Sequence, residues 1–160
     1  MQLREVPVSV PDGCQLIAGQ AHFIKTVEDI FEALATSVPG LKFGVAFSEA
    51  SGKALIRHDG TDQGCISAAV EASKLLGAGH SFVVFLKDAY PINVLHKLKS
   101  VDEVVSIYCA TSNPVTFIVA ETGQSRAILG VADGLSPKGV EGEADKEERL
   151  ELLRKIGYKR

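Results

Sequence analysis

The chain has 160 residues, of which 46% are hydrophobic and 23% are charged, a balance typical of a folded globular protein and not of a disordered chain. This length suits one domain over residues 1–160. The net charge of -3 favours neither nucleic acid nor a membrane as a partner, because both usually bind a basic face.

The first half of the chain alternates strand and helix patterns. Two strands flank the turn PDG, and a helix that Thr26 caps follows them and stops at Pro39-Gly40. In the next strand Leu41, Phe43, Val45 and Phe47 form one apolar face, and the small residues of the other face leave room for a packing partner. The expected strands are 4–10, 15–23, 41–48 and 54–58, and the expected helices are 26–38 and 62–76, the second closed by Gly77.

The second half begins with the continuous apolar run SFVVFL at 81–86, which predicts a central strand buried on both faces. Pro91 suits the first turn of a short helix that carries Ile92, Leu95 and Leu98. Strands at 103–110, 115–121 and 126–132 are separated by gaps too short for helices, so we expect an antiparallel meander. The tail predicts an amphipathic helix with Leu150, Leu153 and Ile156 on one side.

These elements include hairpins and helical crossovers. They predict an α+β (layered α/β) fold, in which a mixed, largely antiparallel sheet packs with helices.

Neither a membrane span nor a signal peptide is visible in the sequence. No apolar run approaches the ~18 residues that cross a bilayer, and MQLREVPVSV lacks a signal-peptide core, so we expect a cytoplasmic protein. Cys14, Cys65 and Cys109 are widely spaced and form no CxxC or Cys/His pattern. They predict three reduced thiols and no metal site.

His22, in GQAHFIKTVED, is the strongest candidate for a reactive group. It lies just before the expected start of a helix, where free backbone N–H groups and the helix dipole favour an anion. An imidazole there could bind phosphate, act as a general base, or accept a phosphoryl group. A hydrogen-bonded histidine at a strand end is the structural alternative.

The other histidines differ in their surroundings. His80, at the start of the central strand, could face the same cavity as His22, or it could have a capping or packing role alone. His58 and His96 are expected on the surface. The preceding GAG at 77–79 follows a helix and precedes a strand, the reverse of a phosphate-binding loop. The chain also has no P-loop, no GxGxxG turn and no HExxH motif.

Six further polar residues are candidates for substrate binding. In SEASGK, a lysine could bind phosphate and a carboxylate could bind a ribose hydroxyl, although an exposed ion pair explains the same residues. A turn role explains the asparagine of SNP without any ligand. The arginine and aspartate of RAILGVADG could be a phosphate clamp and a hydroxyl acceptor, or could simply end a strand. The candidates are Glu49, Ser51, Lys53, Asn113, Arg126 and Asp133.

Four segments together resemble the adenosine-specific kinase family of small archaeal and bacterial proteins. They are GQAHFIKTVEDIFEAL, TSVPGLKFGVAFSEASGK, GAGHSFVVFLKDAYPINVL and RAILGVADG, and the likeness extends to the ending ELLRKIGYKR. The resemblance implies a compact α/β protein that binds adenosine or AMP, forms a homo-oligomer such as a trimer or hexamer, and carries a phosphorylated histidine. The histidine would be His22 or His80, of which we favour His22.

Three functional hypotheses follow. The first is an adenosine-specific phosphotransferase that uses a phosphorylatable histidine. The second is a non-catalytic adenosine or AMP sensor, favoured by the lack of a nucleotide-binding motif and of clear magnesium ligands. The third is an oligomeric scaffold without a ligand, favoured by the many apolar strands. The sequence leaves the phosphate donor unknown, with Mg as a candidate cofactor.

Overall fold

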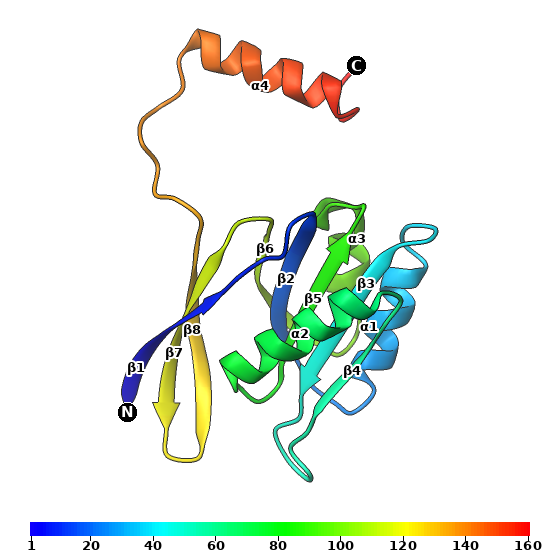
Figure 1. The fold of residues 1–160 in the computed structure, drawn as a ribbon, viewed down its shortest axis with the longest axis vertical. Helices are drawn as coiled ribbons and strands as arrows, with labels where there is room; N and C mark the ends of the chain where they lie inside the picture. The colour runs from blue at the N-terminus through cyan, green and yellow to red at the C-terminus, as the bar shows by residue number, and fades with distance from the viewer.

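The computed structural model describes residues 1–160, whose strands form two antiparallel sheets (Figure 1). The larger sheet has the order β4-β3-β5-β2-β6 and the smaller one β1-β7-β8. The strands are β1 (Gln2–Val8), β2 (Cys14–Ala21), β3 (Lys42–Ser48), β4 (Ile56–Gly60), β5 (Ser81–Lys87), β6 (Val104–Thr111), β7 (Val115–Thr122) and β8 (Ser125–Asp133). The helices are α1 (Thr26–Ala35), α2 (Gln63–Leu76), α3 (Pro91–Lys99) and α4 (Glu143–Lys155). None of these helices is both long and apolar enough to cross a membrane.

The predicted α+β class is confirmed, but the strands form two sheets instead of one mixed sheet. All strand pairs are antiparallel. The crossover through α1 makes β2 and β3 run in the same direction, yet β5 lies between them and pairs with both. Insertion of β5 therefore removes the parallel pair that the crossover led us to expect.

The predicted meander is wrong in one respect. β7 and β8 form a hairpin, whereas β6 pairs with β2 in the larger sheet and not with β7. The turn between β6 and β7 carries the chain from one sheet to the other, helped by Pro114, which has no N–H to donate to a ladder. The turn at residues 11–13 likewise joins strands of different sheets, because β1 pairs with β7.

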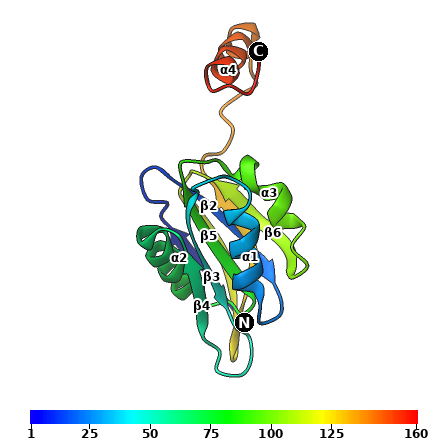
Figure 2. The same cartoon turned by 90° about the vertical axis from the view of Figure 1, so that its right-hand side faces the viewer.

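The larger sheet is covered on both faces (Figure 2). One face packs against α1 and α3, through residues such as Phe43 and Val84. The opposite face packs against α2 and the smaller sheet, through residues such as Phe85 and Phe117. The central strand β5 supplies alternate side chains to the two cores, as the unbroken run SFVVFL predicts.

The predicted small-residue face of β3 is the contact surface of α2. A Cβ on Gly44 would lie 2.2 Å from the backbone nitrogen of Ile66, so only glycine lets the helix approach this closely. Phe43, Val45 and Phe47 belong to the core on the other face. The alternation read from the sequence is confirmed on both sides of the strand.

Helix ends follow the sequence signals in part. Asp62 caps α2 by accepting the N–H of Cys65 at 2.9 Å, and Gly77 ends the helix in the left-handed region at φ 56°. Thr26 is not the predicted cap of α1: Lys25 is the N-cap residue. The Thr26 hydroxyl donates instead to the carbonyl oxygens of Phe23 and His22, so it fixes the preceding loop.

The contact at Gly44 can be tested by substitution. We expect Gly44→Ala to lower the free energy of unfolding by about 3 kcal/mol or more, because the added methyl group meets rigid helix backbone. Denaturant unfolding would measure this. Gly139→Ala is the matched control, since a Cβ there meets nothing within 4 Å, and it should change stability by less than about 0.5 kcal/mol. Equal stability of the two variants would contradict the close approach.

Candidate functional site

One end of the larger sheet brings the two candidate histidines onto neighbouring strands. We call it the histidine end; there β2 and β3 finish and β5 begins. The Ala21 N–H donates to the His80 carbonyl at 2.9 Å, and the His80 N–H donates to the Ser48 carbonyl at 2.7 Å. His22 directly follows Ala21 and is exposed, whereas His80 is half-buried and its ring stacks on Phe47 with centroids 5.9 Å apart. Neither imidazole makes a hydrogen bond within the chain.

A cavity of about 470 Å³ opens beside His80, between the end of β3, the end of α2 and the turn joining β7 to β8. This volume falls within the range of about 300–1,000 Å³ that is typical of small-molecule sites. We call it the serine cavity, because two buried serines line it. The lining residues are Ser48, Glu49, Ala50, Ala54, Ile56, Ser73, Lys74, Gly77, Ala78, Gly79, Gln124 and Ser125.

Both of these serines have hydroxyl groups without a partner. Ser48 and Ser73 are 7% and 0% exposed, and neither Oγ atom makes a hydrogen bond. A buried hydroxyl without a hydrogen bond costs about 1–3 kcal/mol, so such groups normally have a partner. Both serines line the same cavity, which makes it the candidate site for a polar ligand.

Glu49 closes the rim of this cavity within the turn from β3 to β4. Its carboxylate accepts the N–H of Leu55 at 3.0 Å and the Nε of Arg57 at 2.8 Å. These contacts, the Leu55 N–H first, hold the pKa of Glu49 below its usual value, so the carboxylate stays ionised. Ser51 and Lys53 lie exposed in the same turn. The structure thus places these three candidates together.

The backbone around the histidine end is strained. His80, Phe23 and Ala54 have φ angles of 61°, 80° and 50°, a region that residues other than glycine rarely adopt. The fourth such residue, Asp88, lies at the opposite end of the sheet. Such strain concentrates at functional sites, where the surrounding structure has to hold it.

A buried acidic residue beside His22 is missing from the sequence prediction. Glu103 is 2% exposed, its carbonyl accepts the His22 N–H at 2.9 Å, and its Oε1 pairs with Lys25 Nζ at 2.8 Å. Asp29 also pairs with Lys25, and these carboxylates raise the pKa of the lysine. Glu103 Oε2 has no partner. In the sequence, the i,i+4 spacing of Lys25 and Asp29 indicates an ion pair on a helix, but nothing links Glu103 to either residue.

Arg126 does not line the serine cavity, and its guanidinium contacts other parts of the chain. Its Nη1 donates to the carbonyl oxygens of Leu75 and Leu76 at 3.1 and 3.3 Å, and its Nη2 pairs with Glu121 at 2.8 Å. The guanidinium therefore fastens the β7–β8 hairpin to the free carbonyl groups at the end of α2. It borders a smaller hollow of about 280 Å³ that shares Gly77 with the serine cavity.

Asn113 and Asp133 lie at the other end of the sheet. Asp133 Oδ1 accepts the Thr111 hydroxyl at 2.8 Å and the Asn113 amide at 3.1 Å, which closes the turn between β6 and β7. Thr111 pairs with Leu16, five residues along β2 from Ala21 at the histidine end. At about 3.4 Å per residue this is a separation of about 17 Å. The predicted substrate residues therefore fall into two separate groups.

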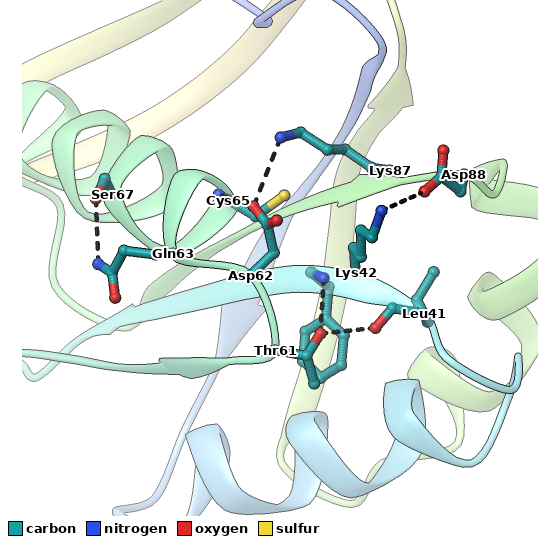
Figure 3. Close-up of polar contacts among 10 residues, drawn as sticks. Leu41, Lys42, Thr61, Asp62, Gln63, Cys65, Ser67, Lys87 and Asp88 are labelled. Atoms are coloured by element: carbon teal, nitrogen blue, oxygen red, sulfur yellow. Dashed lines mark hydrogen bonds and ion pairs between the residues drawn. The ribbon is translucent and has the colours of Figure 1, made fainter.

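Ion pairs close this far end (Figure 3). Lys87 Nζ lies 3.6 Å from Asp62, and Lys42 Nζ lies 3.3 Å from Asp88. Burial and, next, Asp62 raise the pKa of the Cys65 thiol to about 12. No group of three or more histidine, cysteine or acidic side chains is close enough to hold a metal ion. We therefore derive no step through the candidate Mg cofactor.

The structure is that of a small α+β protein with a candidate ligand cavity at one end of its larger sheet. A family model described as "Adenosine specific kinase" matches residues 6–159, so the chain belongs to this family, as its motifs suggested. The crystal structure of the PH1918 protein from Pyrococcus horikoshii OT3 is similar, with 44% identity and a TM-score of 0.94. The similarity covers 99% of this chain and 98% of that one. A comparison with curated proteins gave no match.

The three thiols are free and buried, and we expect them to be unreactive in the folded protein. Burial raises the pKa of Cys65 to about 12 and that of Cys109 to about 11, so both stay protonated at pH 8. A coloured thiol reagent at that pH should label none of them quickly and all three after unfolding. Because the pKa values of both thiols are higher in the folded than in the unfolded chain, the buried protonated thiols favour the folded state. This stabilisation is complete below the ordinary thiol pKa of 9.0 and is lost as the pH rises above it. Rapid labelling of the native protein would contradict the burial.

Proposed function

We propose that the chain binds adenosine or AMP in the serine cavity and acts as an adenosine-specific phosphotransferase through a histidine. The single observation that carries the ligand site is the pair of partnerless buried hydroxyls on Ser48 and Ser73. Adenosine offers ribose hydroxyls that donate and accept hydrogen bonds, an amino group that donates and ring nitrogens that accept. Membership of the adenosine-specific kinase family supports this choice of ligand.

The histidines at the histidine end are the side chains that would carry the phosphoryl group. A ring nitrogen of His22 attacks the phosphorus of a donor, and the bond from phosphorus to the donor's leaving group breaks. A ribose hydroxyl of adenosine then attacks the same phosphorus, the N–P bond breaks, and the freed imidazole takes the hydroxyl proton. His80, whose backbone N–H donates a hydrogen bond to the Ser48 carbonyl, is the second candidate for this role.

Lysines near the histidine end could stabilise the charge of the phosphoryl group. Lys25, within three residues of His22, carries a proton held firmly by two carboxylates. Lys53 is exposed in the turn beside Glu49. Phosphoryl transfer needs such cations where charge develops on the oxygens. The cytoplasmic location and the assembly into a trimer or hexamer stay predictions, and the phosphate donor stays unknown.

A non-catalytic adenosine or AMP sensor is the second candidate function. The observation that favours it is the absence of any cluster of three acidic or metal-ligating side chains. In that case the serine cavity binds the nucleoside and His22 makes no covalent bond. The two functions share the cavity and differ in the chemistry of the histidine.

Replacement of the histidine separates these functions. We expect intact-mass measurement, under conditions that keep acid-labile phosphohistidine, to find one phosphate on the native protein and none on His22→Asn. Adenosine binding by His22→Asn should stay within about tenfold, or about 1.4 kcal/mol. If the His22→Asn variant still carries the phosphate, its loss from His80→Asn would assign the phosphate to His80. If the protein carries no phosphate and converts adenosine with none of the donors tested, the phosphotransferase function is refuted and the sensor function remains.

Replacement of the serines tests the ligand site itself. Ser48→Ala and Ser73→Ala should each weaken adenosine binding in calorimetry by about tenfold, since each loses a hydrogen bond of about 1–2 kcal/mol. Neither should destabilise the free protein, because the hydroxyls have no partner there. Ser67→Ala, an exposed change on α2, is the control and should bind as the unchanged protein does. Normal binding by both cavity variants would refute this site.

A further inference from the structure

Three elements form the serine cavity, and they differ in what they offer a nucleoside. β3 contributes Ser48, α2 contributes Ser73, and the β7–β8 turn contributes Gln124 and Ser125. The Ser48 carbonyl accepts the N–H of His80, so the wall at β3 is the one next to the candidate histidines. A ribose hydroxyl that receives phosphate has to lie at this wall. The base then lies against α2 and the β7–β8 turn.

The β7–β8 turn is held in place on both sides of Gln124. Arg126 donates to the carbonyl oxygens at the end of α2, which fastens the hairpin to the helix. Within the turn, the Thr122 hydroxyl donates to the Ser125 carbonyl at 3.2 Å and lies 2.9 Å from the Ser125 hydroxyl. A side chain on a fixed backbone has less freedom to lose when a ligand binds. Gln124 is therefore well placed for specific recognition.

Gln124 is also the one side-chain amide in the lining of the cavity. The charged side chains of the lining have partners already: the Glu49 carboxylate is bonded within its own turn, and Lys74 Nζ pairs with Glu71 at 2.6 Å. The hydrogen bonds of the β7–β8 turn leave the Gln124 amide free. Gln124 lines both the serine cavity and the neighbouring hollow of about 280 Å³, so its side chain has room to turn toward a ligand.

A side-chain amide matches one edge of adenine. It carries an N–H donor and an oxygen acceptor side by side. Adenine presents N7, an acceptor, beside its 6-amino group, a donor, and glutamine can bond to both at once. Guanine presents two acceptors, N7 and O6, at the same edge, so an amide can satisfy only one of them. An amide facing the base therefore selects adenine.

We propose, building on the proposed function, that Gln124 determines the specificity of the serine cavity for adenine. Its amide oxygen accepts a hydrogen bond from the 6-amino group of adenosine, and its amide nitrogen donates to N7. With the base held at the β7–β8 turn, the ribose points toward Ser48 and the histidine end. One contact thus selects the base and orients the hydroxyl that reacts.

Calorimetry with two adenosine analogues tests this contact. Purine riboside lacks the 6-amino group, and 7-deazaadenosine has a C–H group in place of N7. We expect the unchanged protein to bind each analogue about tenfold more weakly than adenosine. Gln124→Ala should bind adenosine about tenfold more weakly, and it should bind all three nucleosides equally within about twofold, because the partner of both groups is gone. A merely structural role of Gln124 would leave the differences between the nucleosides unchanged.

A second variant separates the two hydrogen bonds. Gln124→Glu keeps an acceptor for the 6-amino group but has no donor for N7, so it should bind 7-deazaadenosine as well as adenosine and purine riboside more weakly. Gln63→Ala, an exposed glutamine on α2 outside the cavity, is the control and should keep all preferences. If Gln124→Ala discriminates as the unchanged protein does, this contact is refuted and the ligand site stands. If the unchanged protein binds no adenosine, the proposed function fails as well.

Discussion

Burial of the five-stranded sheet on both faces is the constraint on which the rest of the structure depends. α1 and α3 cover one face, and α2 together with the smaller sheet covers the other, so no face of this sheet is free to bind a ligand. Polar groups can gather only where the strands end. The two ends differ: one carries ion pairs such as Lys87 with Asp62, and the other holds the serine cavity and both candidate histidines.

The same constraint explains why α2 determines the position of the serine cavity. Gly44 lets α2 lie directly on β3, and the helix then ends at Gly77, beside Ser48. Arg126 uses the free carbonyl groups at that end to fasten the β7–β8 hairpin, which supplies Gln124 and Ser125 to the cavity. The last carbonyl groups of α2, which would otherwise bind water, thus connect the helix to the smaller sheet through Arg126. This contact holds the hairpin that forms one wall of the cavity.

Local patterns predicted the helices and the strand faces well, because burial imposes a period on the sequence. Gly77, Asp62 and the small-residue face of β3 were all readable in this way. Pairing between distant strands leaves no such period, so neither the partner of β6 nor the division into two sheets was visible. Within the site, His22 and His80 stood out by residue type. Glu103 and Ser73 resembled ordinary strand and helix residues, and only the three-dimensional packing shows that each is buried without a full set of partners.

A groove of about 1,120 Å³ between α3 and the end of α4 lies at the opposite end of the sheet from the serine cavity. Thr111 and Ser112 line the groove, while Ser48 and Gly79 line the cavity, and the two sets share no residue. Asn113 and Asp133 lie at the groove end, where Asp133 accepts hydrogen bonds from Thr111 and Asn113, and so they are separated from the serine cavity. Side chains at one end can therefore be replaced without changing the lining of the other.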